Sequence, residues 1–429
     1  MKRIIALLLI FVMALSCFIS CGEDEETEGA ESSKGLEFKL NKDEKSYTLA
    51  GIGTCEAENI VVDYYNGYPV TEIARNAMSR TSSIKTLTIG DSVTKIGEMS
   101  FYGCENLTEV KIGKGVTTIG KNVFEKCISL IEIEIPDGIK EIPMRAFGDC
   151  TSLKSVKIGE DVEEIRRYAF ENCSSLCSVT IPEKIKYVRE NAFLGCNNLV
   201  EVINFSNIEF TRGSEENGRI AYYALKIHKG ESELVYKEDF MFLTSDKTNY
   251  LVKYLGDKTE VNLPNDYEGE AYVIAPYAFS NNKTITDVTF GKKTAGIGKN
   301  AFEGATALKT VNISSSVAAI GAEAFSGCVA LDNISIPDSV QAIGMSAFKN
   351  CTSIKEMKLS KNVRLIGENA FENCNSLTSV KMENKEGWVA GNKSISAEDL
   401  ANEAKAAKYF TEDYLNQRWA VATEEDATK

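Results

Sequence analysis

The sequence predicts a β-rich solenoid, made of two stacked arrays of 23-residue repeats with a β insert between them and a helical cap at the C-terminus. The first observation is a large apolar residue that recurs every 23 positions. It occurs at Met78, Phe101, Phe124, Phe147, Phe170 and Phe193, and again at Phe279, Phe302, Phe325, Phe348 and Phe371. The second is a pair of apolar residues two positions apart in each repeat, which is typical of a short strand with one buried face. A repeat of this length cannot bury its apolar face alone, so neighbouring repeats must stack.

One complete repeat begins at Cys104. Its apolar positions follow the pattern C-x2-L-x2-V-x-I-x3-V-x2-I-G-x3-F, in which Val110 and Ile112 belong to the strand and Phe124 closes the repeat. The residue after the strand is glycine or proline in seven repeats, as expected where a strand ends and the chain turns. One strand per repeat predicts a parallel ladder.

This pattern resembles the leucine-rich repeats of the BspA-like, Treponema-type family of bacterial surface proteins. The resemblance covers about residues 47–385 and depends on the I-G step, as at Ile119-Gly120, the A-F pair, as at Ala146-Phe147, and the C-x-x-L start of each repeat. The family implies a curved leucine-rich repeat solenoid that binds other macromolecules, with adhesion to host proteins among its roles. Fold does not fix function, so the resemblance does not name a partner.

The N-terminal region predicts export and lipid anchoring. A basic start and an apolar run from Ile4 to Ala14 indicate a signal peptide over residues 1–20. The sequence Phe18-Ile19-Ser20-Cys21 resembles a bacterial lipobox, which implies that Cys21 is lipidated; cleavage before Cys17 is the alternative. We therefore expect an extracytoplasmic protein of the bacterial cell envelope that meets the membrane only through its lipid.

The remaining chain divides where the repeat register begins and lapses. The expected order is a flexible acidic tether over 21–36, an N-terminal cap over 37–76, a first array over 77–203, a β hairpin or meander insert with a second cap over 204–272, a second array over 273–385 and a C-terminal helical cap over 386–429. Tyr47 and Tyr250 stand at matching places before the two arrays, so each array is expected to have its own lead-in. Ser396 with Asp399 predicts the N-cap of the last segment, for which a partner-binding helix is the alternative.

Cysteine placement argues against a disulfide framework. The chain has twelve cysteines, and eight share one repeat slot: Cys104, Cys127, Cys150, Cys173, Cys196, Cys328, Cys351 and Cys374. Other repeats place Thr81, Asn282 or Ala305 in that slot, which indicates a requirement for a small residue. We interpret the eight as a ladder of buried thiols, although bridges between neighbouring repeats are compatible with their spacing.

Composition excludes several classes of function. The chain has 48 Lys and Arg against 62 Asp and Glu, a formal net charge of −14, which disfavours a nucleic-acid partner. The loop-like string Gly296-Ile297-Gly298-Lys299 is a repeat turn that lacks the full phosphate-loop pattern. His228 is the single histidine and is expected to lie on a surface strand without a catalytic partner. We expect no enzyme activity, no cofactor and no metal site.

Candidate binding residues are those that alternate with the buried strand positions and must face solvent. The charged ones are Glu109, Lys111, Glu132, Glu134, Lys157, Glu356 and Lys358. In the insert, Tyr222 and Tyr223 could stack on sugars, or could cover the open end of the first array. The leading hypothesis is a monomeric surface protein that binds an extracellular or envelope protein, for instance a host matrix protein. The alternatives are a glycan-binding surface protein and a passive envelope scaffold.

Overall fold

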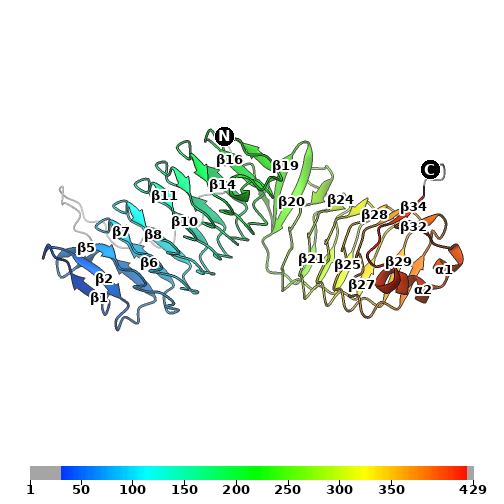
Figure 1. Cartoon of the computed structure of the whole chain (residues 1–429), viewed down its shortest axis with the longest axis horizontal. Coiled ribbons are helices and arrows are strands. Elements are labelled where there is room, and N and C mark those ends of the chain that lie inside the picture. The colour runs from blue at the N-terminus through cyan, green and yellow to red at the C-terminus, as the bar shows by residue number, and fades with distance from the viewer. Residues whose placement is uncertain (1–29, 423–429) are drawn as a thin grey trace.

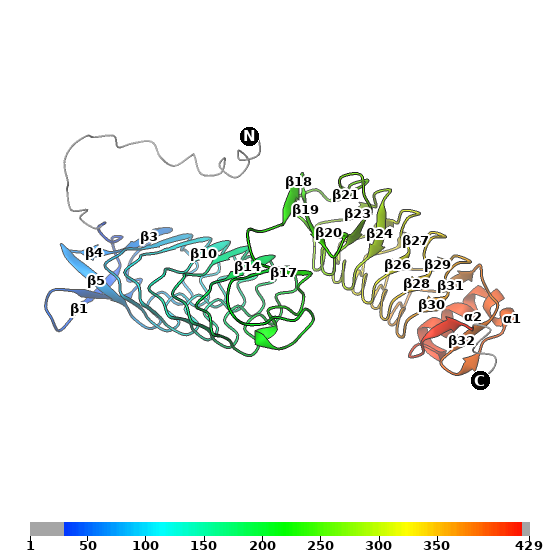
Figure 2. The same cartoon turned by 90° about the horizontal axis from the view of Figure 1, so that it is seen from above.

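The computed structural model describes residues 30–422 and confirms the predicted β-solenoid (Figure 1). Two arrays of stacked coils lie end to end and bend where they meet, and the C-terminal helices lie at the far end of the second array (Figures 1 and 2). In the described part of the chain, no helix combines the length and the apolar character that crossing a membrane requires. The signal peptide and the lipidation predicted at Cys21 lie outside the described residues.

The first array contains two parallel ladders. The main ladder consists of β3 (Asn59–Val62), β6 (Thr86–Ile89), β8 (Glu109–Ile112), β10 (Glu132–Glu134) and β12 (Ser155–Lys157), followed by β14 (Ser178–Ile181), β16 (Glu201–Asn204) and β17 (Lys226–His228). The second consists of short strands at the I-G step, namely β7 (Lys95–Ile96), β9 (Thr118–Ile119), β11 (Glu141–Ile142), β13 (Glu164–Ile165) and β15 (Tyr187–Val188). Gly120 allows this second ladder to pack closely, because a Cβ there would lie 2.4 Å from the backbone nitrogen of Glu98.

The recurring phenylalanines form a continuous stack along each array. In the first array, ring centroids are 5.3 Å apart from Phe101 to Phe124 and 5.7 Å apart from Phe124 to Phe147, with nearly parallel planes. The residues two before and two after Phe124, Asn122 and Lys126, have φ values of 57° and 63°. This left-handed backbone directs the N–H groups of these turns at carbonyls of the following coil, as when Phe124 N donates to Ala146 O at 2.9 Å. The phenylalanine turns therefore add a third set of bonds between coils.

The repeated cysteine slot lies beside this stack. Cys127 Sγ donates to the carbonyl of Phe101 at 3.3 Å, and Cys150 Sγ donates to that of Phe124 at 3.2 Å. The ten cysteines that the structure describes are all free and buried. Burial raises the pKa of Cys104 to about 11 and that of Cys374 to about 12. A buried, protonated thiol that donates to the preceding coil explains why the slot selects a small residue.

The N-terminal cap closes the open end of the first array. Strand β1 (Glu37–Leu40) runs antiparallel to β2 (Tyr47–Gly51), and β2 runs parallel to β5 (Tyr68–Ile73), which pairs antiparallel with the short β4 (Tyr64–Tyr65). The structure differs from the expected flexible tether at residues 30–36. Ser32 N donates to Tyr64 O at 2.7 Å and Leu36 is buried, because the edge of the cap offers this segment backbone partners.

The region expected to be an insert begins with one more coil of the first array. Strand β17 pairs in parallel with β16, with Glu201 opposite Lys226, two residues later than a 23-residue step predicts. The first strand of the region expected to be a hairpin or meander is this β17, which covers only Lys226–His228. Ile220, Ala221 and Ala224 instead pack in turns on the core of the first array after a 3-10 turn at Asn217–Arg219, and so cover the end of its phenylalanine stack.

A β meander then leads into the second array. Strands β18 (Val235–Lys237), β19 (Phe240–Ser245) and β20 (Thr248–Tyr254) are antiparallel, and β20 pairs in parallel with β22 (Tyr272–Ile274). Leu251 lies opposite Ile274 as Leu49 lies opposite Ile73 in the N-terminal cap. The two arrays therefore start with equivalent pairings.

The second array repeats the two-ladder plan. Its main ladder is β21 (Glu260–Asn262), β23 (Asp287–Thr289), β25 (Thr310–Asn312) and β27 (Asn333–Ser335), followed by β29 (Glu356–Leu359) and β31 (Ser379–Met382). The second ladder continues from β22 through β24 (Thr294–Ile297), β26 (Ala319–Ile320), β28 (Ala342–Ile343) and β30 (Leu365–Ile366). Gly296-Ile297-Gly298-Lys299 falls on and directly after β24, as the repeat-turn interpretation expected.

The C-terminal segment closes the last coil. It consists of β32 (Trp388–Ala390), β33 (Lys393–Ser394), α1 (Ala397–Ala401), α2 (Glu403–Lys408), a π turn at Tyr409–Asp413 and β34 (Trp419–Val421). Ser396 caps α1 by accepting from Asp399 N at 3.1 Å. Strand β34 pairs antiparallel with β30 and so ends the parallel ladder. Phe410 packs on Phe371, with ring centroids 5.6 Å apart.

Candidate binding site at the junction of the arrays

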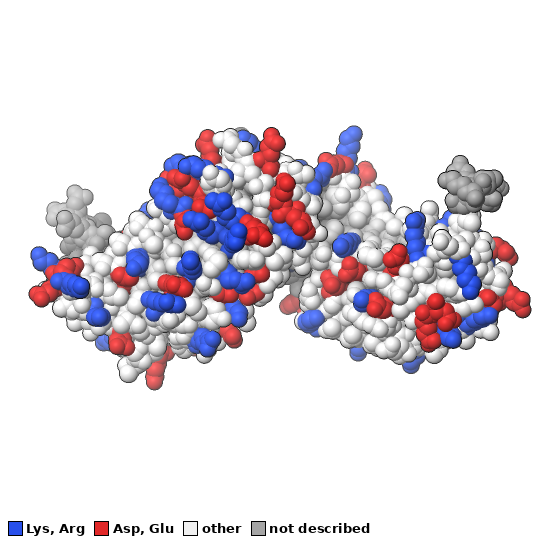
Figure 3. Space-filling view, in the orientation of Figure 1, with Lys and Arg blue, Asp and Glu red and all other residues white. Residues whose placement is uncertain are grey.

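The predicted residues of the first array lie side by side on the exposed face of its main ladder. Glu132 is opposite both Glu109 and Ser155 in the register, and Glu134 is opposite Lys157. Lys157 Nζ lies 2.5 Å from Glu134 Oε1. Figure 3 shows acidic and basic side chains interspersed over the visible side of both arrays. Exposed pairs of this kind stabilise the fold little. Glu132 forms no ion pair among the described residues, so the column is a polar surface of mixed charge.

The remaining predicted charged residues are Lys111, on the first array, and Glu356 and Lys358, on the second array. Lys111 Nζ pairs with Glu109 on β8 itself, at 3.2 Å. Glu356 and Lys358 lie on β29 of the second array, where Lys358 Nζ pairs with Glu383 at 2.7 Å. The structure therefore brings together the five charged residues of the first array and leaves those of the second array apart.

Tyr222 and Tyr223 lie where the arrays meet. Their rings contact edge to face with centroids 4.8 Å apart, and Tyr223 contacts Tyr277 of the second array in the same way at 5.2 Å. Both tyrosines are partly buried, and burial raises the pKa of Tyr223. The pair bridges the two arrays, with its ring edges engaged by neighbouring rings.

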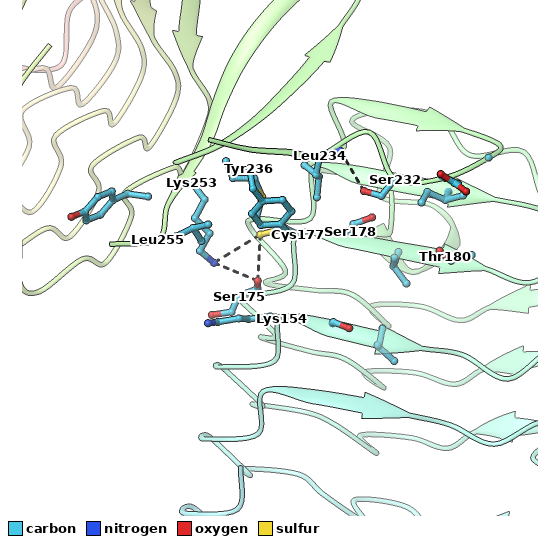
Figure 4. Close-up of a pocket in the computed structure, with 18 of the residues that line it drawn as sticks. Lys154, Ser175, Cys177, Ser178, Thr180, Ser232, Leu234, Tyr236, Lys253 and Leu255 are labelled. Carbon is cyan, nitrogen blue, oxygen red and sulfur yellow. Dashed lines mark hydrogen bonds between the residues drawn. The ribbon is translucent and has the colours of Figure 1, made fainter. Parts of the chain in front are cut away.

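A pocket of about 710 Å³ opens at the junction, beside strands β12 and β14 of the main ladder (Figure 4). Its floor is formed by exposed positions of β12 and β14, including Ser155, Ser178 and Thr180. The loop before β18 and the ends of β18 and β20 provide the other wall. The polar columns of the first array therefore lead directly into a concave site between the arrays.

Two lysines and a thiol lie together at one end of this pocket. Lys253 Nζ donates to the carbonyl of Ser175 at 3.4 Å and lies 3.9 Å from Cys177 Sγ (Figure 4). Burial raises the pKa of the Cys177 thiol, and the positive charges of Lys253 and Lys154 oppose that rise. Cys177 is thus a protonated, buried thiol, and the lysines are the charged groups available to a ligand.

A buried carboxylate supports the floor of the pocket. Glu201 has no exposed surface, and its carboxylate accepts hydrogen bonds from Ser178 Oγ at 2.7 Å, Ser232 Oγ at 2.6 Å, Glu233 N at 2.6 Å and His228 Nε2 at 3.1 Å. Burial by itself raises the pKa of Glu201, but the four donated bonds outweigh it and leave the pKa below its ordinary value. The loop over the pocket is thereby tied to the first array.

This network corrects the expectation for His228, which is not a surface residue. Its side chain is only 13% exposed, because the extra coil places it against Glu201. Its other ring nitrogen lies 3.2 Å from Lys229 O. In the described part of the chain, no serine or cysteine is within hydrogen-bond reach of the ring, so the arrangement lacks an activated nucleophile. Nor do the described residues gather three potential metal ligands at one place.

Sequence reasoning identified part of this pocket. The alternation of the strands predicts that Ser178 and Thr180 face outward, and both line the pocket. No sequence pattern predicts that Lys253 lines the pocket, because its position depends on how the second array packs against the first. Glu201 gave none either, because it occupies the same repeat slot as the exposed Glu132.

Comparison with protein families agrees with this architecture. The model described as BspA type leucine-rich repeat region (6 copies) matches residues 71–200 and 272–389, which is more than half of the chain. The chain belongs to this family. Leucine-rich repeat solenoids of this kind are typically non-catalytic binding proteins that offer extended surfaces. None of the curated proteins compared with the chain matches it.

Solved structures of bacterial leucine-rich repeat proteins resemble this chain. A leucine rich cell surface protein from Faecalibacterium prausnitzii is 23% identical, with a TM-score of 0.40, over 82% of this chain and 94% of that one. The pneumococcal vaccine antigen PcpA is 20% identical, with a TM-score of 0.40, over 82% and 87%. The T. pallidum leucine rich repeat protein is 16% identical, with a TM-score of 0.18, over 80% and 88%. At these identities the likeness concerns the fold and not the partner.

Proposed function

We propose that this BspA-type repeat protein is a lipid-anchored cell-surface protein that binds a macromolecular partner. The partner lies across the exposed ladder face of the first array and enters the junction pocket. The observation that carries the proposal is the continuity between the two: the column from Glu132 and Lys157 reaches the pocket floor at Ser155 and Ser178. A rigid, repetitive polar face gives many weak contacts. The junction pocket adds a concave site from which a ligand can exclude water, and the strongest contacts of an interface form at such sites.

The anchor is the second part of the proposal. The leader and the lipobox-like sequence before Cys21 support cleavage and lipidation, which would leave the solenoid attached by a short segment outside the cytoplasm. Mass spectrometry of the mature N-terminus tests this directly. A diacylated Cys21 is expected, whereas an unmodified Cys21 or a chain that begins at Cys17 would contradict the assignment.

A capture experiment tests the binding function. Purified protein without residues 1–21 is immobilised and exposed to cell-surface and matrix extracts, and the captured molecules are identified. Capture is expected to weaken when the charges of Glu132 and Lys157 are both reversed, because these residues lead into the pocket. The matched control reverses Glu356 and Lys358, which occupy the equivalent strand face of the second array. Equal loss in both variants, or capture that neither affects, would contradict a site on the first array.

Glycan capture through Tyr222 and Tyr223, outside the junction pocket, and a passive scaffold are the competing functions. Tyr222 and Tyr223 were the sequence-based candidates for sugar stacking, and their position against Tyr277 supports a joining role. Glycan-array binding that is lost in Tyr222→Ala and Tyr223→Ala would favour that site. A folded protein that binds neither extracts nor glycans would support the passive scaffold.

A further inference from the structure

The junction pocket contains positive charge that the protein does not neutralise. Lys157 and Lys258 lie near the junction and pair with Glu134 and Asp239, but Lys154 and Lys253 form no ion pair in the part of the chain that the structure describes. Glu231 is the single acidic residue among the described residues that line the pocket. Glu201 lies beneath the floor and its charge is satisfied by four hydrogen bonds. The two unpaired lysines are therefore available to an anionic ligand group.

The buried carboxylate of Glu201 orients the hydroxyl groups of Ser178 and Ser232 in the pocket. Ser178 Oγ and Ser232 Oγ both donate to Glu201 Oε2, at 2.7 Å and 2.6 Å. A hydroxyl has one proton and two lone pairs, so each serine donates its proton to Glu201 and can only accept from a ligand. Ser232 Oγ already accepts from Leu234 N at 3.3 Å, which leaves it one lone pair. The ligand must therefore bring hydrogen-bond donors as well as an anionic group.

The third feature is an exposed aromatic ring. Tyr236 is 65% exposed on the edge strand β18 and lines the pocket (Figure 4). Leu255, also exposed, lies on the same wall. An aromatic ring offers a flat apolar face with a polar tip, against which the C–H face of a sugar ring can pack.

From these features we propose that the pocket binds an acidic glycan, through sugar units that carry a carboxylate. The carboxylate would bind Lys154 and Lys253, the sugar hydroxyls would donate to Ser178 and Ser232, and the ring face would pack on Tyr236. An acidic peptide fits less well, because it brings carboxylates without the row of hydroxyl donors from which Ser178 and Ser232 would accept. This inference rests on the proposed function and names its class of partner.

Binding of polygalacturonate to the protein without residues 1–21 tests the inference, by calorimetry and by biolayer interferometry. We expect binding that weakens as salt rises and is lost when the polymer is fully methyl-esterified, since the ester removes the carboxylate and keeps the sugar rings. Poly-glutamate is the comparison for the competing class. Binding of poly-glutamate as tight as that of polygalacturonate would overturn the glycan assignment, as would binding of the methyl ester.

Variants locate the site. The double substitution K154M/K253M keeps the aliphatic stems and removes both charges, and we expect it to weaken polygalacturonate binding by about tenfold or more. Tyr236→Ala should weaken it as well, whereas Lys358→Met, on the second array, should not. Circular dichroism checks that each variant is folded. No polygalacturonate binding, or equal binding by K154M/K253M and the unchanged protein, would overturn the inference.

The two proposals fail separately. Capture of a protein partner that depends on Glu132 and Lys157, in a protein that does not bind polygalacturonate, overturns the glycan inference and leaves the proposed function in place. Loss of both would remove the first-array face as a binding surface.

Discussion

Substitution of Glu201 by glutamine is the sharpest test of how the junction is held. Glu201 is fully buried and its carboxylate accepts four hydrogen bonds. Glutamine keeps the shape but removes the charge and turns one acceptor into a donor, which faces donors already in place. Hydrogen bonds to a charged acceptor stabilise more than neutral ones, and breaking a buried network costs several kcal/mol. We therefore expect the free energy of unfolding to fall by about 2–4 kcal/mol.

Urea unfolding can assign this loss to one array. Both tryptophans, Trp388 and Trp419, lie in the cap of the second array, so their fluorescence reports that array, whereas circular dichroism reports both. With a slope of about 2 kcal/mol/M, the expected loss moves the first-array transition by about 1–2 M urea. The tryptophan transition should move less, because coils stabilise mainly their neighbours.

The control is the same substitution in the same repeat slot. Glu132→Gln changes an exposed residue of β10, and surface substitutions of this kind rarely affect stability. The two variants therefore differ only in burial and partners. A shift for Glu201→Gln no larger than that for Glu132→Gln would refute the claim that the carboxylate network holds the loop to the first array.

Three further predictions follow from the structure. The stabilisation from Glu201 should be complete above the pKa of an unfolded glutamate, about 4.3, and should be lost as pH falls toward the lowered pKa of Glu201 in the folded protein. Urea titrations from pH 7 to 3 should therefore show a fall in the free energy of unfolding that Glu201→Gln lacks. Identical pH profiles for the two proteins would contradict this. Phe147→Ala should cost about 3–5 kcal/mol in the first-array urea transition, and a tryptophan transition that moves as far would show that the arrays unfold as one unit. Cys104 and Cys374, with pKa values raised to about 11 and 12, should not react with a thiol reagent at pH 8 until urea unfolds the protein; rapid labelling of the native protein would contradict their burial.

The 23-residue spacing predicts the ladders and the phenylalanine stack because the same contacts recur in every coil. Phe124 meets Phe101 and Phe147 through identical turns, so one repeat pattern contains nearly all the information needed. The helical cap follows similarly from a local signal, since Ser396 bonds to Asp399 three residues away.

The junction could not be predicted in this way. The coil that ends at β17 is two residues longer than the 23-residue coils before it, and this shift places His228 beside Glu201. No periodic pattern covers that contact, so His228 was wrongly assigned to the surface. The residues that make the pocket also come from distant parts of the chain, as Lys253 and Ser175 do.

The sequence by itself determined that the protein is a solenoid of two arrays, with polar columns outside and thiols and phenylalanines inside. Short-range periodicity suffices for this, because each coil is stabilised by neighbours of the same pattern. Only the tertiary structure decided that the columns lead into a pocket with two unpaired lysines, and that one glutamate of the repeated slot is buried beneath it. Those properties depend on how the end of one array packs on the start of the next, where the repeat is interrupted and each contact is unique.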